Sequence, residues 1–150
     1  MNILIVGGGL QALSVARSLK KERYSVIALL HRGDISTKSK YIDELYTIDI
    51  TPTYKKEYLS SVHRVLQVHA ISVIIPLSDV TAEFLSIHKV NLEHEYHLKC
   101  AIPNYDIFQK ANDKWQLMDL CKENFIPHPR TQLLTSSNLQ EAAGAIGFPA

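Results

Sequence analysis

The sequence predicts an α/β fold, in which a parallel β-sheet is flanked by helices and followed by a short helical extension. Short runs of branched apolar residues, typical of buried parallel strands, alternate with segments whose apolar residues recur at helical spacing. Three consecutive glycines, Gly7–Gly9, join the first such run to the first helical segment. The alternation extends over residues 1–103 and is absent from residues 104–150, so we expect two parts.

Strands are predicted at 2–6, 25–30, 45–48, 72–76 and 98–102. The first helix carries its apolar stripe on Ala12, Val15, Ala16 and Leu19. A second helix is expected to start at Thr51 and Pro52 and to carry an apolar stripe over residues 58–69. A third should follow Ser78 or Asp79 and bury Val80, Phe84 and Ile87, before a polar stretch at 91–99.

After residue 103 the pattern is mainly helical. One or two helical turns are expected at 105–110, and a helix to about residue 124 that opens with a capping box of Asp113 and Gln116. Prolines exclude a helix at 126–129, and a strand is predicted at 130–134. A second capping box, Ser137 and Gln140, opens a helix that Gly147 should end. Because the last residues have the pattern of a turn that leads into a new strand, we expect a fragment of a longer protein.

Composition narrows the classes of function. The formal net charge is +1 and 21% of the residues are charged, which argues against a nucleic-acid-binding or membrane-surface protein. No apolar run reaches the roughly 18 residues of a membrane span, and the N-terminus lacks the pattern of a signal peptide. Cys100 and Cys121 are too few for a disulfide framework and lack metal-type spacing. A cytoplasmic location is therefore expected.

The glycine loop has two interpretations. Gly7-x-Gly9-x-x-Ala12, placed between a strand and a helix, fits the dinucleotide fingerprint, whose backbone amides bind a diphosphate. That fingerprint requires an acid at the end of the second strand, where this chain has Leu30 and His31. Asp34 comes late, and Arg32 could instead face a 2′-phosphate. Alternatively, the glycines only permit a tight turn and close packing.

Two further places in the chain are candidates for ligand contacts, and each also has a purely structural explanation. Ser78 and Asp79 follow a strand at its expected carboxyl end, where ligands of open α/β sheets bind, although Ser78 also suits a simple helix cap. Lys114 lies in the first turn of its helix, where a cation opposes the helix dipole. A bound phosphate would resolve that conflict, but an exposed lysine paired with Asp113 or Asp119 would explain it too.

No catalytic or metal-binding pattern is evident elsewhere. The seven histidines are scattered, and none forms a paired motif on one helical face. His94 and His97 share a predicted polar loop with Glu93 and Glu95, which could attract a metal ion adventitiously. Cys121 lies on an apolar stripe and is expected in the core. We therefore predict neither catalytic residues nor a metal site in this chain.

Taken together, three segments resemble the N-terminal part of ATP-grasp ligases, the superfamily of carbamoyl-phosphate synthase large chains, biotin carboxylase and carboxylate–amine ligases. ILIVGGGLQALSVARSL (3–19) is similar to the opening strand–loop–helix of the family, and IIPLSDVTAEFLS (74–86) to the unit that precedes its substrate cleft. The strongest match is ANDKWQLMDLCKENFIPHPRTQLL (111–134) with LQEAAGAIGFPA (139–150). The resemblance implies a Rossmann-like preATP-grasp domain at 1–103 and the start of the ATP-grasp region at 104–150.

By this resemblance, Lys114 matches an ATP-binding lysine, and Gly7, Gly8, Gly9, Ser78 and Asp79 shape the cleft for a small-molecule substrate. The parent protein would use ATP and Mg²⁺ to activate a carboxylate as an acyl phosphate for attack by an amine. Its metal ligands and catalytic arginine would lie beyond this chain, which alone should not catalyse. Two alternatives remain open: a stand-alone NAD(P)- or nucleotide-binding module, and an interaction domain that forms a homodimer.

Overall fold

The structure is a computed structural model that describes residues 1–51, 53 and 55–146. It divides into two compact units, Met1–Tyr105 and Asp106–Ala150. Each unit is described by itself below.

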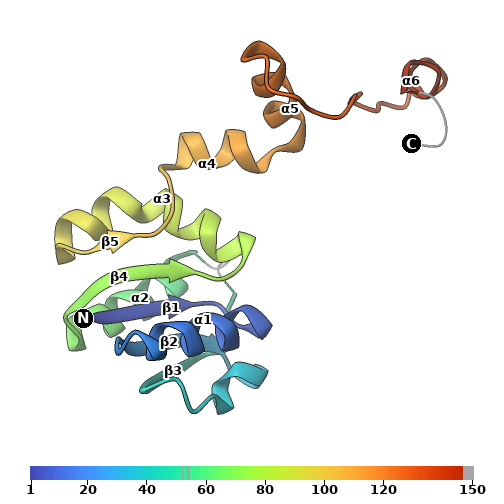
Figure 1. Cartoon of the computed structure of the whole chain (residues 1–150). Coiled ribbons are helices and arrows are strands. Elements are labelled where there is room, and N and C mark those ends of the chain that lie inside the picture. The colour runs from blue at the N-terminus through green and yellow to red at the C-terminus, as the bar shows by residue number, and fades with distance from the viewer. Residues whose placement is uncertain (52, 54, 147–150) are drawn as a thin grey trace. The chain divides into compact units, whose positions relative to one another are not determined.

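The first unit is built on a parallel sheet of five strands in the order β3-β2-β1-β4-β5 (Figure 1). The strands are β1 (Asn2–Val6), β2 (Ser25–His31), β3 (Glu44–Ile48), β4 (Ile71–Pro76) and β5 (Lys99–Cys100). The helices are α1 (Gly9–Lys21), the short 3-10 helix η1 (Ile35–Lys38), α2 (Lys55–Val68) and α3 (Asp79–Tyr96). The predicted α/β fold is confirmed, with the strand order of a Rossmann-like sheet.

Both faces of the sheet are covered at its centre, which explains why β1 and β2 are almost continuously apolar. On one face, Ile5 of β1 packs with Ala12 and Ala16 of α1. On the other, Leu4 and Val6 pack with residues of α2 and α3. Side chains alternate between the two faces of the sheet along a strand. A polar substitution at any central position of β1 would therefore bury a polar group in one of the two cores.

Helix α3 differs most from the prediction. It continues to Tyr96, so the expected polar loop at 91–96 is helical, and β5 contains only two residues. Leu92 is buried in the core, and Lys89 and Glu93 hold β5 by hydrogen bonds from Lys89 Nζ to the Cys100 carbonyl (3.0 Å) and from the Cys100 amide to Glu93 Oε1 (2.9 Å). These tertiary contacts extend the helix beyond what its polar sequence predicts.

The buried face of α3 also differs from the predicted one. Val80 is 47% exposed, whereas Thr81 and Leu85 are buried with Phe84. The start of α2 is at Lys55; of the predicted start, Pro52 lies outside the described residues.

The second unit contains α4 (Tyr105–Asn112), which begins at the boundary, α5 (Lys114–Glu123) and α6 (Leu139–Ile146). The strand predicted at 130–134 does not form, because among the described residues of this unit there is no strand with which it could pair. Helix α6 begins after Asn138, one residue later than the predicted box allows, and the Ser137 hydroxyl contacts that of Thr135 instead. Gly147 lies outside the described residues.

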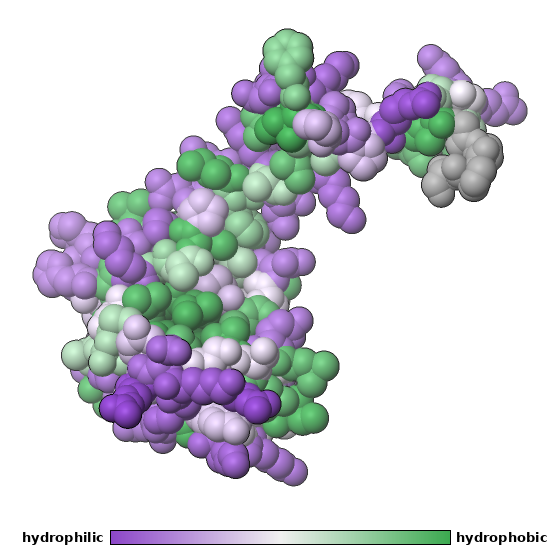
Figure 2. Space-filling view, viewed as in Figure 1, coloured by the Kyte–Doolittle hydropathy of each residue, from purple (hydrophilic) through white to green (hydrophobic). Residues whose placement is uncertain are grey.

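The second unit buries very little. Within its described part, Ala142 is the single residue classed as buried, and Phe125 is 94% exposed. Cys121, expected in the core, is half-buried, because the apolar stripe of α5 has little to pack against. Figure 2 shows apolar groups on the visible surface of both units. None of the helices described is both long enough and apolar enough to span a bilayer.

Candidate functional site

A hollow of about 710 Å³ opens at the carboxyl ends of β1 and β4. From this pair of strands the sheet extends to β2 and β3 on one side and to β5 on the other. The connections therefore leave the sheet in opposite directions here, which opens a crevice, and ligands of open α/β sheets bind at such switch points. The volume lies within the range of small-molecule sites, roughly 300–1,000 Å³.

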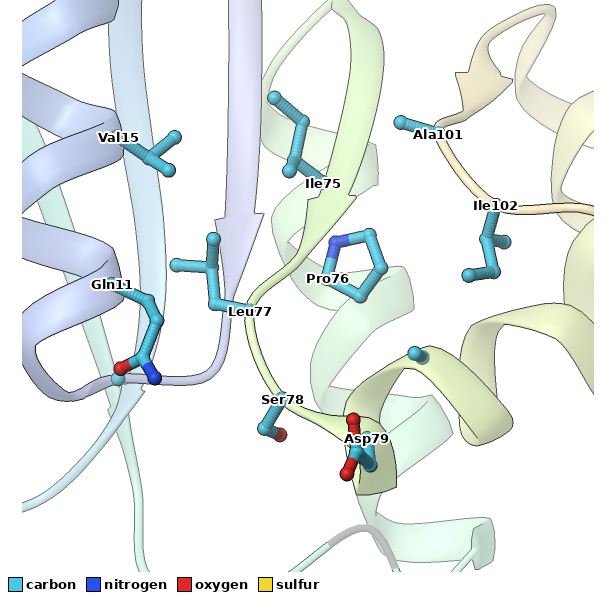
Figure 3. A pocket seen from close by; sticks show the side chains of 11 residues that line it. Gln11, Val15, Ile75, Pro76, Leu77, Ser78, Asp79, Ala101 and Ile102 are labelled. Carbon is cyan, nitrogen blue, oxygen red and sulfur yellow. The ribbon is translucent and has the colours of Figure 1, made fainter. Parts of the chain in front are cut away.

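The hollow has an apolar wall and a polar end (Figure 3). The polar end is formed by Gln11, Ser78 and Asp79. Gly8 also lines the hollow. The wall consists of aliphatic side chains from α1, β4 and the segments that follow β4 and β5: Val15, Ile75, Pro76, Leu77, Ala82, Ala101 and Ile102. Among these lining residues Asp79 is the one ionic group. The site therefore offers one carboxylate that attracts cations, together with neutral groups that form hydrogen bonds.

Ser78 caps α3, as one of its two interpretations predicts. Its hydroxyl accepts a hydrogen bond from the Thr81 amide (3.3 Å), and the Thr81 hydroxyl accepts one from the Ser78 amide (3.0 Å). This capping box orients the turn after β4 and leaves Asp79, the first helical residue, exposed at the mouth of the hollow. The capping role of Ser78 therefore positions Asp79 and is compatible with a ligand in the hollow.

The glycine loop makes the turn from β1 into α1. Gly7 and Gly9 have φ values of +96° and +80°, which side chains with a Cβ rarely adopt. Gly8 is needed for a different reason: a Cβ there would lie 2.1 Å from Asp34 Oδ2. Of the predicted cleft residues the structure brings Gly8 together with Ser78 and Asp79, whereas Gly7 and Gly9 shape the loop and do not line the hollow.

The Asp34 carboxylate occupies the N-terminus of α1. It accepts hydrogen bonds from the Gly9 amide (2.9 and 3.1 Å), from the Ser36 amide (2.8 Å) and from the buried Ser36 hydroxyl. Partial burial favours a higher pKa for this carboxyl, but the hydrogen bonds outweigh it and the pKa is lowered. The amide that opens α1 therefore already has an anion as its partner.

This contact was not predicted, although Asp34 was considered as a possible ribose ligand. The local pattern Asp34-Ile-Ser36 could have identified only the other role of this carboxylate, in which it accepts from the amide two residues later and caps η1. The contact with Gly9 has no such local signal. The contact also bears on the dinucleotide interpretation. A charged carboxylate at Gly9 repels a diphosphate, and Arg32, the alternative phosphate ligand, is paired with Asp49 (2.8 Å).

Lys114 lies in the second unit as the first residue of α5. The preceding Asp113 caps this helix by accepting from the Gln116 amide (2.9 Å), as predicted. Lys114 is exposed, and within the part of the chain that the structure describes it has no carboxylate partner.

Among the described residues no group of three or more His, Cys, Asp or Glu side chains is arranged to hold a metal ion. His94 lies on α3, and His97 ends that helix in the left-handed conformation, so the predicted loop that would bring them together does not form. Burial raises the pKa of the Cys100 thiol to about 11, so it is almost entirely protonated at neutral pH.

Comparison with known proteins gives one curated relative and many related folds. No family model matches the sequence. The D-aspartate ligase of Enterococcus faecium (strain Aus0004) is 22% identical over 143 residues, which cover 91% of this chain and 33% of the relative. This chain thus spans about a third of the length of that ligase.

Two kinds of solved structure share the fold. The biotin carboxylase domain of Hydrogenobacter thermophilus 2-oxoglutarate carboxylase, a dimer with MgADP, ADP and bicarbonate, has a TM-score of 0.70 at 19% identity over 99% of this chain and 33% of its own. N5-carboxyaminoimidazole synthetase from Staphylococcus aureus, complexed with ADP, has a TM-score of 0.67 at 19% identity, covering 95% of this chain and 35% of its own. The fold that the sequence resemblance implied is thus confirmed: this chain shares the architecture of about a third of these carboxylase and synthetase structures.

Proposed function

We propose that this chain is the N-terminal part of an ATP- and Mg²⁺-dependent ligase that activates a carboxylate as an acyl phosphate and transfers it to an amine. The observation that carries the proposal is the fold. Almost the whole chain matches about a third of the length of carboxylase and synthetase structures, three of which contain ADP. The curated relative reported above is named a D-aspartate ligase, which supports the carboxylate–amine class.

In this proposal the switch-point hollow takes part of the substrate. Its apolar wall excludes water from one side, while Gln11, Ser78 and Asp79 provide polar contacts at one end. The Asp79 carboxylate favours the amine or another cationic group of a substrate over a second carboxylate. The glycine loop contributes shape and no nucleotide contact, because Asp34 already occupies its amide.

Lys114 is proposed to contact ATP phosphates. An exposed ammonium in the first turn of a helix opposes the helix dipole, and an anion beside it would remove this unfavourable interaction. The residues present therefore fit a phosphate. They do not fit Mg²⁺, since the described part of the chain contains no suitable cluster of carboxylates, and we derive no metal-dependent step within it.

The chain alone is proposed to lack catalytic activity. In phosphoryl transfer the protein mainly positions groups and neutralises charge, which requires metal ligands as well as one lysine. The exposed apolar side chains of the second unit also support this, because helices with so little buried surface are normally stabilised by further protein. A homodimer of the parent ligase is a further possibility that the dimeric carboxylase domain supports.

The coding sequence of the native protein and its mass give the first test. We expect a product well above 16.9 kDa that continues with a lysine-bearing strand and a glycine-rich loop. A stop codon directly after Ala150 would refute the ligase proposal.

The role of Lys114 is tested in that native protein by measuring ADP formation in the presence of candidate amino acids. Lys114→Gln should raise the KM for ATP about tenfold or more, because one phosphate contact is lost. Lys110→Gln, which removes an exposed lysine from α4, is the matched control and should leave KM unchanged. Equal effects of the two substitutions would contradict the assignment.

A further inference from the structure

A second hollow, of about 460 Å³, lies on the side of α1 that faces away from the switch-point site. Its helical wall is formed by Leu10, Leu13, Ser14 and Arg17, which recur at i, i+3, i+4 and i+7 and so share one side of α1. The stripe that packs on the sheet, Ala12 and Ala16, is a different one. The two hollows have no lining residue in common.

The opposite wall comes from the segment between η1 and β3. Lys40 Nζ lies 5.5 Å from the centroid of the Tyr41 ring, a cation–π contact that holds the ammonium at the rim. The Tyr41 amide donates to Ser39 Oγ (3.3 Å), so the hydroxyl hydrogen of Ser39 stays available to a ligand. Ser14 adds a second hydroxyl from α1.

The rim of this hollow carries uncompensated positive charge. Within the described residues neither Arg17 nor Lys40 has a carboxylate within ion-pair distance. The neighbouring Lys20 does, since its ammonium is 2.8 Å from Asp43. Two cations and two hydroxyls thus line one cavity that no acidic side chain enters.

The lining also has an apolar part, formed by Leu10 and Leu13. Leu10 is 72% exposed, whereas Ala12 and Ala16 of the same helix are buried. With Leu13 it would contact the apolar part of a ligand, while the cations would bind an anionic group at the rim. The chemistry of the cavity therefore matches a molecule with both parts.

We propose that this hollow binds an organic anion, namely an aryl or alkyl group that carries a phosphate or carboxylate. Arg17 and Lys40 bind the anionic group, with Ser14 and Ser39 as hydrogen-bond donors, and Leu10 and Leu13 contact the apolar body. The site shares no lining residue with the proposed substrate cleft and does not include Lys114, so the proposal does not rest on the proposed ligase activity.

The test is a titration of the full chain with phenyl phosphate at constant ionic strength, followed by ¹H–¹⁵N NMR of the amides of residues 10–17 and 39–41. Inorganic phosphate and phenol are titrated separately. We expect saturable shifts with phenyl phosphate and binding about tenfold weaker with either part alone, because each part lacks half of the contacts. Equal affinity for phenyl phosphate and inorganic phosphate would overturn the apolar contact and with it the proposal.

Substitutions of the two cations test whether they form the binding site. Arg17→Gln and Lys40→Gln should each weaken phenyl phosphate binding by about fivefold or more, since each removes a charge-assisted contact. Arg64→Gln is the matched control: it removes an exposed arginine from α2, which packs on the opposite face of the sheet. The substituted side chains are exposed, and circular dichroism verifies that each variant is folded. An equal loss in Arg64→Gln would show that binding is non-specific and would refute the site.

Discussion

Replacement of Asp34 by alanine should destabilise the first unit more than removal of an exposed surface carboxylate such as Asp49 does. The carboxylate caps η1 through the Ser36 amide and closes the glycine loop through the Gly9 amide. Loss of an aspartate cap costs about 0.5–2 kcal/mol. The Gly9 amide and the buried Ser36 hydroxyl also lose their partner, at about 1–3 kcal/mol for an unsatisfied buried group. Together we expect about 2–4 kcal/mol.

Urea denaturation at pH 7 measures this loss as the difference in the free energy of unfolding. The control is Asp49→Ala, which removes an exposed carboxylate paired with an exposed Arg32 and should cost at most about 0.5–1 kcal/mol. If Asp34→Ala costs no more than Asp49→Ala, the carboxylate does not hold the glycine loop and the reasoning fails.

The same contact predicts a pH dependence. The pKa of Asp34 is lower in the folded chain than its ordinary value of 3.8, so the unfolded chain takes up this proton first as the pH falls. The stabilisation is complete above pH 3.8 and is lost as the pH falls through the folded pKa. The difference in stability between wild type and Asp34→Asn should therefore narrow below pH 3.8, and a constant difference would contradict the lowered pKa.

Three further outcomes are expected. Gly8→Ala should destabilise the chain more than Gly33→Ala in the same denaturation assay. A Cβ at Gly8 would clash with the Asp34 carboxylate, whereas a Cβ at Gly33 meets no neighbouring atom and is opposed only by the positive φ of that residue. The reverse order of stability would argue against the close approach of Asp34 to Gly8. Iodoacetamide should modify Cys121 well before Cys100, as followed by mass spectrometry, since burial raises the pKa of Cys100 to about 11; comparable rates would show that Cys100 is accessible. NADH fluorescence should show no saturable binding to the chain, because Asp34 occupies the amide that a diphosphate would need, and micromolar binding would restore the dinucleotide interpretation.

Most of the first unit could be predicted because its pattern is local. The apolar runs of β1 and β2 are buried on both faces, and this leaves an unambiguous signal in the sequence. The end of α3 could not be predicted in the same way. Its last turns are polar, and they are helical because Leu92 enters the core and because Lys89 and Glu93 bind the backbone of a strand that follows.

In the second unit the local pattern predicted a helix cap but not the strand pairing or the burial. The cap of α5 was predicted, since Asp113 and the Gln116 amide are three residues apart and need nothing else. The strand at 130–134 and the burial of Cys121 were not correctly predicted, because a strand requires a partner and a core residue requires a second surface. Neither requirement is visible in the local pattern.

The glycine loop shows which features the sequence determined and which the tertiary structure determined. By itself the sequence determined a sharp strand-to-helix turn at Gly7–Gly9 and the absence of an acid at the end of the second strand, since both are properties of adjacent residues. Only the tertiary structure decided which anion the loop holds. Asp34 lies 25 positions from Gly9 and reaches its amide because the segment after β2 folds back over the start of α1. A contact of that sequence separation depends on how the β2–η1 connection packs, and no local pattern contains it.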